Sequence, residues 1–156
     1  MYSIKLIVYD FDGVMTDNKV YLDQNGNEMV QVNRADGLGV SLIKKLGIPQ
    51  IILSSEANPV VSTRARKLDI PCRQGIKNKE KELRKFCKEN NYDLKLVGYV
   101  GNDINDLEAM QMAGISFCPA DAHQDIIKIS THVLKTKGGK GVVRELLDFL
   151  QSTTKK

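Results

Sequence analysis

Two aspartates separated by one residue follow a short, mostly apolar run near the start of the sequence. Asp10 and Asp12 begin the segment DFDGVMTD, directly after residues 4–9. Carboxylates at the end of a buried strand cost free energy unless a positive charge compensates them. Mg²⁺ could supply that charge, because it prefers carboxylate, water and phosphate oxygens as ligands. Taken alone, however, such a pair is more often an ordinary turn, since Asp and Gly are common turn residues.

Polar side chains also follow the next apolar runs along the chain. Ser54 and Ser55 come after residues 51–53, and their hydroxyls could bind a phosphoryl oxygen. The segment GNDIND at 101–106 comes after residues 96–100 and adds oxygen ligands at a third strand end. Each motif alone is weak, but the three in this order favour a site for a metal ion and a phosphate group.

Lys79 lies at the start of a predicted helix and could neutralise a bound phosphoryl group and one carboxylate. The alternative is a solvent-exposed helix face, which is the usual place for a lysine in so charged a segment. Only the three preceding motifs favour the functional interpretation.

Short apolar runs alternate with amphipathic stretches. The apolar runs are typical of buried parallel strands and lie at residues 4–9, 51–53, 96–100 and 115–117. The amphipathic stretches have apolar residues three and four apart, as helices do, and lie at residues 38–46, 59–68, 79–90, 106–112 and 142–150. This alternation predicts a doubly wound, mainly parallel α/β sheet of the Rossmann-like kind, with ligands at the carboxyl ends of the strands.

One segment departs from this alternation. Residues 20–22 and 28–32 are strand-like and flank the sequence DQNGN, and an Asn-Gly pair at that place predicts a β-hairpin. The hairpin is too small to be a domain. We expect a single domain over residues 1–151, with a polar tail at 152–156.

The composition excludes several classes of protein. The chain has 156 residues, 42% of them hydrophobic, and a net charge of +4. That excess is too small to indicate a nucleic-acid surface, and 6% aromatic residues without Trp argue against a stacking platform for single strands. The apolar run at residues 6–9 falls far short of the roughly 20 residues that a membrane span needs. We therefore expect neither nucleic acid nor a membrane as a partner.

The sequence also bears on the cellular compartment. No basic segment followed by an apolar stretch opens the chain, so we expect a cytoplasmic protein. The three cysteines, Cys72, Cys87 and Cys118, are odd in number and lack CxxC spacing, which favours reduced thiols over disulfides or a zinc site. His123 and His132 lie outside every motif and lack metal-ligand spacing.

The order of these motifs resembles the haloacid dehalogenase superfamily of phosphohydrolases. The pattern is DxDGxxTD, a serine at the second strand end, a downstream lysine and a G-[DN]-D-x-x-D loop, and it covers nearly the whole chain. Because no insertion is large enough for a cap domain and a hairpin follows the first strand, the chain is similar to the capless sugar-acid phosphatase branch. That branch includes phosphatases of octulosonate 8-phosphate and of nine-carbon sialic-type acids, and a domain appended to acylneuraminate cytidylyltransferases. The segment KGGKGVVRE at 137–145 is similar to its C-terminal glycine-rich motif.

The resemblance implies a role for each matching residue. Asp10 would be the nucleophile that takes up the phosphoryl group, and Asp12 the general acid and base. Ser54 and Lys79 would bind the phosphoryl oxygens, with the amide of Gly13 contributing to a backbone nest. Mg²⁺ would bind Asp10, the main-chain carbonyl of Asp12 and the loop at 101–106.

The chain departs from the family pattern at one place. Asn102 stands where family members usually carry Asp, and Asp103 follows it. A neutral amide ligand would lower the affinity for metal, and the sequence leaves open which of the two residues binds the metal directly. Asp106 is the better candidate for orienting the others.

The preferred substrate depends on Glu56. By the resemblance, octulosonate phosphatases commonly have Arg here, whereas sialic-type relatives tend to have Glu and a later Lys, as Glu56 and Lys67 do in this chain. This favours a nine-carbon 2-keto-3-deoxy acid 9-phosphate, with octulosonate 8-phosphate next. Alternatively, Glu56 only begins a helix, where a carboxylate is favoured by about 0.3–1 kcal/mol.

The resemblance further implies a homotetramer. Subunits of this branch pair through their hairpins, and the glycine-rich segment can close a neighbour's site. Two rival interpretations remain: a weakly active or non-catalytic tetramerisation domain, which Asn102 keeps open, and a phosphate-responsive receiver-like domain. The presence of Asp10, Asp12, Ser54 and Lys79 together argues against a pure scaffold.

Overall fold

The central sheet is built from four strands whose residues are all buried. The computed structural model describes residues 3–154 and places these strands at β1 (Leu6–Tyr9), β4 (Gln50–Leu53), β6 (Val97–Val100) and β7 (Ile115–Cys118). Their nearly continuous apolar sequences fit a parallel sheet that is covered on both faces. Two further strands of two residues each lie at the edges, β5 (Cys72–Arg73) and β8 (His132–Val133).

The strand order is β5-β4-β1-β6-β7-β8, and every neighbouring pair is parallel. Tyr9, the last residue of β1, is in register with Ile52 of β4 and with Val100 of β6. The carboxyl ends of these three strands are therefore almost level, so the loops that follow them meet at one edge of the sheet. The predicted doubly wound, mainly parallel fold is confirmed.

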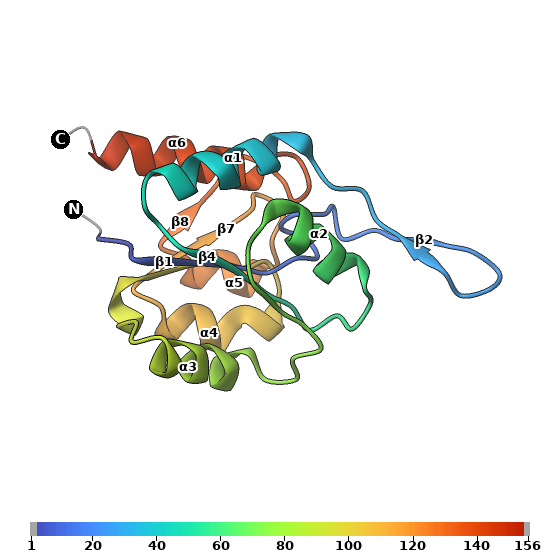
Figure 1. The fold of residues 1–156 in the computed structure, drawn as a ribbon, viewed down its shortest axis with the longest axis horizontal. Helices are drawn as coiled ribbons and strands as arrows, with labels where there is room; N and C mark the ends of the chain where they lie inside the picture. The colour runs from blue at the N-terminus through green and yellow to red at the C-terminus, as the bar shows by residue number, and fades with distance from the viewer. Residues whose placement is uncertain (1–2, 155–156) are drawn as a thin grey trace.

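Helices cover both faces of the sheet (Figure 1). One layer consists of α1 (Arg34–Lys45), α2 (Val60–Leu68) and α6 (Val142–Thr154), which share one apolar core. The opposite layer consists of α3 (Lys79–Glu89), α4 (Leu107–Met112) and α5 (Gln124–Ile129), around a second core. Short 3-10 turns precede β6 and α4, at Leu94–Leu96 and Ile104–Asp106.

Some boundaries differ from the sequence-based expectation. Helix α1 begins at Arg34, four residues early, because the Asn33 side chain accepts a hydrogen bond from Ala35 N and so caps the helix. Helix α6 continues through Thr154, so residues 152–154 of the predicted tail are helical, while 155–156 lie outside the described residues. Helix α5 and the two edge strands were not predicted, because segments of six and two residues carry little periodicity.

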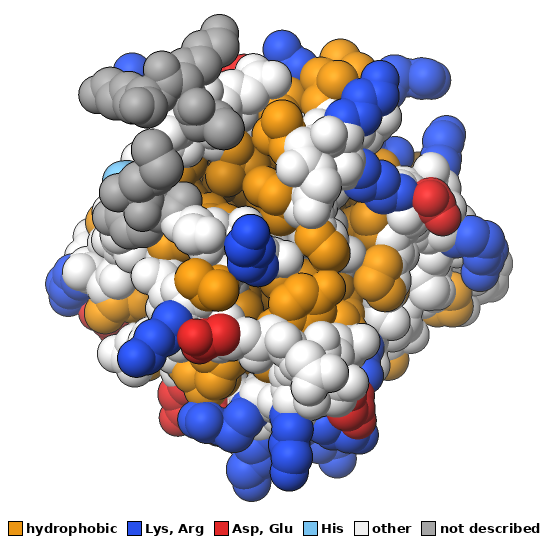
Figure 2. All heavy atoms as spheres, turned by 60° about the vertical axis from the view of Figure 1, so that its left-hand side comes forward, with side chains coloured by type: hydrophobic (Ala, Val, Ile, Leu, Met, Phe, Trp, Pro, Cys, Tyr) orange, Lys and Arg blue, Asp and Glu red, His pale blue; other side chains and the backbone are white. Residues whose placement is uncertain are grey.

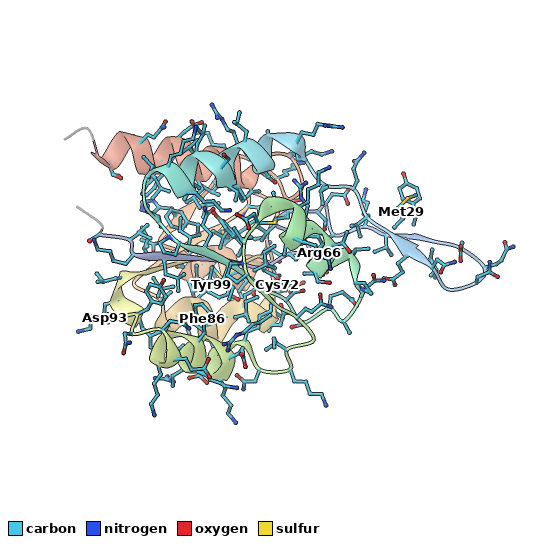
Figure 3. The ribbon with its side chains drawn as sticks, in the orientation of Figure 1. Met29, Arg66, Cys72, Phe86, Asp93 and Tyr99 are labelled. Carbon is cyan, nitrogen blue, oxygen red and sulfur yellow. The ribbon has the colours of Figure 1, made fainter. Side chains whose placement is uncertain are left out.

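The predicted hairpin is formed by β2 (Tyr21–Leu22) and β3 (Glu28–Met29), which pair antiparallel. Its turn is fixed by Asp23, whose carboxylate accepts hydrogen bonds from the main-chain N of two residues within the loop. The hairpin projects away from the body (Figure 1), and Figure 3 shows Met29 on this projection, far from Tyr99 in the interior. No cap domain occurs among residues 3–154.

The end of the molecule where both termini lie is opposite the hairpin. Figure 2 shows apolar side chains gathered on that end, with Lys and Arg side chains around them. None of the helices within residues 3–154 is both long enough and apolar enough to cross a bilayer.

Candidate active site

The loops after β1, β4 and β6 enclose a cavity of about 220 Å³ at the carboxyl edge of the sheet. Seven residues singled out from the sequence line it: Asp10, Asp12, Ser54, Ser55, Glu56, Asn102 and Asp103. They come together because the three strands end at the same level. Among the sequence-predicted residues, Lys79 lies directly behind this cavity and Lys67 lies outside it.

Lys79 is buried between two carboxylates. Its Nζ lies 2.7 Å from Asp10 Oδ1 and 2.8 Å from Asp106 Oδ1, and the lysine is only 2% exposed. Asp106 Oδ1 also accepts a hydrogen bond from the Tyr99 hydroxyl at 2.9 Å. The alternative of a solvent-exposed lysine at this helix start is therefore wrong. A buried cation persists only when it is paired, and here two acidic side chains pair it.

Burial and the neighbouring charges alter the proton affinities of these groups. Burial, together with the negative charge of Asp106, raises the pKa of Asp10 to about 8, although Lys79 opposes this effect. Burial disfavours the charged form of Lys79, but Asp10 and Asp106 outweigh it and raise the lysine's pKa. Burial and the nearby Glu56 raise the pKa of Asp12, against a hydrogen bond from Thr16. The cavity thus holds more negative charge than Lys79 balances, which favours binding of a further cation.

Three oxygen-bearing groups converge in the cavity: the Asp10 carboxylate, the main-chain carbonyl of Asp12 and the side-chain amide of Asn102. The side-chain amide of Asn102 faces Asp10 Oδ2 and the main-chain oxygen of Asp12, and its facing atom lies 2.9 Å from each. With its nitrogen toward them the amide donates to both. With its oxygen toward them three oxygens meet at one point, which is the donor set that a hard cation such as Mg²⁺ prefers.

Asp103 also lines the cavity, but one of its carboxylate oxygens is engaged locally. Its carboxylate accepts a hydrogen bond from Ile104 N at 2.7 Å, and so caps the turn that follows. Asp106 Oδ2 accepts from Asn102 N at 3.0 Å, which holds the loop, as expected for an orienting residue. Within residues 3–154 no three His, Cys, Asp or Glu side chains form a metal-binding group.

Gly13 makes this convergence possible. Its φ of +84° lies in the left-handed region, and a Cβ there would come within 1.9 Å of Asn102 Nδ2. Gly13 N donates to Thr16 Oγ1 at 3.3 Å, and that hydroxyl lies 3.4 Å from Asp12 Oδ1. The absence of a side chain at Gly13 therefore lets the loops after β1 and β6 approach each other.

The loop after β4 supplies hydroxyls and one carboxylate. Ser54 is buried, and its Oγ accepts a hydrogen bond from Glu56 N at 3.1 Å. Glu56 Oε1 accepts from the main-chain N of the next two residues, at 2.9 Å each, so it caps a turn four residues before α2 begins. The Ser55 hydroxyl accepts from Asn105 Nδ2 at 3.2 Å, which joins this loop to the one after β6.

Two cavity residues were missed, and one predicted residue lies apart. Asn18 and Asn105 also line the cavity, although the sequence did not single them out. Asn18 directly follows DFDGVMTD, and Asn105 lies within GNDIND, so their places at these motifs were the available signal. Lys67 instead lines a neighbouring cavity of about 450 Å³ between the hairpin and α2, together with Arg64.

The glycine-rich segment, which the resemblance implies can close a neighbour's site, makes contacts within its own chain as well. Gly139 N donates to Val14 O at 3.0 Å, in the loop that follows Asp10 and Asp12. The segment is therefore part of the support of its own active-site loop.

The fold and the site together define a phosphohydrolase of the α/β class without a cap. The chain belongs to the haloacid dehalogenase-like hydrolase family, whose match covers residues 54–146, more than half of the sequence. This confirms the family that the motifs indicated, and with it the expected enzyme class, a phosphoric monoester hydrolase.

Named relatives narrow the branch. The chain is 33% identical to 3-deoxy-D-manno-octulosonate 8-phosphate phosphatase KdsC of Haemophilus influenzae, over 95% of this chain and 83% of that protein. It is 30% identical to N-acylneuraminate cytidylyltransferase A of Danio rerio, over 98% of this chain but only 36% of that protein. The crystal structure of the Moraxella catarrhalis octulosonate phosphatase, in complex with magnesium, phosphate and KDO, superposes with a TM-score of 0.92 at 28% identity, covering 96% of this chain and 87% of that one.

Proposed function

We propose that this protein is a Mg²⁺-dependent phosphatase of 2-keto-3-deoxy sugar-acid phosphates. The observation that carries the proposal is the Asp10–Lys79 ion pair, buried at the carboxyl edge of the sheet, with Asn102 facing the second oxygen of Asp10. The relatives support the substrate class, because the names of both refer to sugar acids with a 2-keto-3-deoxy or closely related skeleton.

The reaction proceeds in two displacements. A carboxylate oxygen of Asp10 attacks phosphorus, an O–P bond forms to Asp10, and the P–O bond to the sugar breaks. Asp12 gives its proton to the departing alkoxide, and its raised pKa favours the protonated form that this step requires. Asp12 then takes a proton from water as the water oxygen attacks phosphorus, which releases phosphate and restores Asp10. Lys79 and the Ser54 hydroxyl bind the phosphoryl oxygens throughout.

Asp10, the main-chain oxygen of Asp12 and Asn102 would hold the metal ion, and their convergence fits that role. When bound, Mg²⁺ neutralises charge on the phosphoryl oxygens and keeps the phosphate in line with Asp10. Asn102 is the direct ligand in this proposal and Asp103 is not, since the Asp103 carboxylate caps Ile104 N. The neutral amide lowers the affinity for metal relative to a carboxylate.

Glu56 supports a nine-carbon 9-phosphate as the preferred substrate, with octulosonate 8-phosphate next. It lines the cavity that contains Asp10 and is exposed, so it is accessible to the sugar portion of a substrate bound there. Lys67 contributes only from the neighbouring cavity, which also contains Glu28 and Asn58.

Self-association through the hairpin accompanies this function. Tyr21, Leu22 and Met29 are 72%, 68% and 63% exposed, an unusual concentration of large apolar side chains on one small element. A homotetramer would cover them. The cytoplasmic location expected from the sequence fits the three cysteines, all of them free.

The covalent step has a direct test. Rapid acid quench of the enzyme with acylneuraminate 9-phosphate and Mg²⁺, followed by intact mass analysis, should reveal one added phosphoryl group. The Asp10→Asn variant should show neither the adduct nor turnover. Turnover that persists in this variant, or an adduct that maps to another residue, would contradict the assignment.

The second candidate function is a tetramerisation domain with little or no activity. The 36% coverage of the cytidylyltransferase relative, which places the match within a larger protein, is the observation that favours it. A stable tetramer without metal-dependent phosphate release would support this candidate over the phosphatase.

A further inference from the structure

The glycine-rich segment at residues 137–141 connects β8 to α6 and lies on the loop that carries Asp10 and Asp12. Gly139 N donates to Val14 O at 3.0 Å, and Asn33 Nδ2 lies 3.4 Å from Gly139 O. Gly138 N donates to Asp121 Oδ1 at 2.8 Å. These contacts come from three separate parts of the chain, so they fix the segment from several sides.

The contact is too close for any side chain. A Cβ on Gly138 would lie 2.1 Å from Gly13 O and 3.0 Å from Thr16 O. A Cβ on Gly139 would lie 2.5 Å from Asp17 N. Gly139 also has a φ of +72°, whereas Gly138 is not among the glycines with positive φ. The requirement for glycine at 138 therefore arises from this contact alone.

Moving Gly13 would disturb the chemistry of the site. Gly13 is bonded to the carbonyl carbon of Asp12. Because Gly13 has no side chain, the Asn102 side chain can reach Asp10. A side chain at position 138 would force Gly13 O and the glycine-rich segment apart by about an ångström, because close-packed interiors have no slack of that size. A displacement of that size at reacting groups can cost about a hundredfold in rate.

A second loop links the same parts. Residues 119–123 contain Asp121, which holds Gly138 N, and His123, whose main-chain N donates to Asn102 O at 2.8 Å. One short loop thus contacts both the glycine pair and the residue that faces Asp10.

We propose that Gly138 and Gly139 are positioning residues that set the conformation of the Asp10–Asp17 loop from behind, with Asp121 holding the pair in place. This inference rests on the proposed phosphatase function and assigns the glycine-rich segment a role within its own subunit.

The sharpest test compares Gly138→Ala with Gly114→Ala. A Cβ on Gly114 would lie 1.8 Å from Lys95 O, and that glycine also lacks a positive φ. Both substitutions therefore drive a methyl group into a main-chain carbonyl oxygen, but Gly114 precedes β7 at the end of the sheet away from the site. Phosphate release, the Mg²⁺ concentration for half-maximal rate and the melting temperature would be measured for each.

We expect Gly138→Ala to lower kcat at saturating Mg²⁺ by about tenfold to a hundredfold and to raise the half-saturating Mg²⁺ concentration. Gly114→Ala should lower the melting temperature with kcat of the folded enzyme within about twofold of wild type. Equal losses of kcat in both variants, or an unchanged kcat in Gly138→Ala, would overturn the proposal.

Asp121 provides a variant that inserts no atoms. Because Asp121 is exposed, Asp121→Ala should fold, yet lower kcat severalfold, and Asp121→Asn should restore most of the rate by keeping an acceptor for Gly138 N. No effect of Asp121→Ala would remove this residue from the proposal.

If the wild-type enzyme releases no phosphate, the proposed phosphatase function is wrong, but the positioning role of Gly138 and Gly139 can still be tested. In that case ¹⁵N–¹H spectra should show amide shifts for residues 11–17 and 102 in Gly138→Ala but not in Gly114→Ala. Unshifted amides at those residues would contradict the positioning role independently of activity.

Discussion

Removing the buried cation at the site should have a large effect on stability. In Lys79→Met, a side chain of similar length loses its charge while Asp10 and Asp106 remain buried, 5% and 0% exposed. Both lysine contacts, 2.7 and 2.8 Å long, disappear at once. Breaking a buried ion pair from one side typically costs about 3–5 kcal/mol, because an uncompensated charge stays behind.

The loss should be measurable without unfolding the protein. Domains of this size have free energies of unfolding of about 5–15 kcal/mol, so Lys79→Met should remain mostly folded in water. Urea unfolding at pH 7.5, without metal, would be followed by circular dichroism for wild type, Lys79→Met, Asp106→Asn and the double variant.

The double-mutant cycle gives the decisive number. If Lys79 and Asp106 stabilise each other, their effects should not add. The double variant should then lose less free energy of unfolding than the two single variants lose together, by at least about 2 kcal/mol. A coupling below about 0.5 kcal/mol, the range of exposed pairs, would refute the buried triad as the organising interaction of the site.

Four further predictions follow from individual residues. Burial raises the pKa of Asp36 from 3.8 to about 6, so between these values the carboxyl stays protonated in the folded protein and ionises in the unfolded one. Asp36 should therefore contribute a fall of about 3 kcal/mol in the free energy of unfolding as pH rises through that window, in addition to the fall that Asp10 contributes. Asp36→Asn should lose only the Asp36 part, so the stability difference between wild type and variant should change by about 3 kcal/mol between pH 4 and 7 in urea titrations, and a constant difference would contradict the burial argument. Asn102→Asp should lower the half-saturating Mg²⁺ concentration severalfold in phosphate-release assays, since a charged ligand binds the cation more strongly, and a weaker response to metal would exclude Asn102 as a ligand. Glu56→Arg should shift the ratio of kcat/KM values toward octulosonate 8-phosphate, and an unchanged ratio would reduce Glu56 to a turn cap. Tyr21→Lys with Met29→Lys should dissociate the proposed homotetramer in sedimentation velocity, whereas a tetramer of unchanged size would contradict pairing through the hairpin.

Much of the fold could be predicted because the central strands have a clear sequence pattern. Strands β1, β4, β6 and β7 are short apolar runs that end in polar residues, so the sequence alone indicated both the sheet and its functional edge. The edge strands and α5 escaped prediction, since they are held by neighbours rather than by a periodic pattern of their own.

Residues that belong to a recognised motif could be predicted from the sequence. The orientation and burial of their side chains could not, because these depend on contacts in the folded structure. Whether Asn102 or Asp103 faces Asp10 depends on the capping of Ile104 N by Asp103, which no spacing rule reveals. Likewise, the burial of Lys79 depends on the approach of Asp106 from another loop, 27 residues away in sequence. The same-chain contact of Gly138 with Gly13 became apparent only from the packing of main-chain atoms.

The most direct test of the proposed function is a side-by-side assay of phosphate release, with and without Mg²⁺. The substrates are acylneuraminate 9-phosphate, its deaminated analogue and octulosonate 8-phosphate, and Asp10→Asn is the control. We predict rapid, Mg²⁺-dependent release that is fastest with a nine-carbon substrate and absent in the control. Release no faster than that of Asp10→Asn from all three substrates would contradict the proposed phosphatase and favour the assembly-domain alternative.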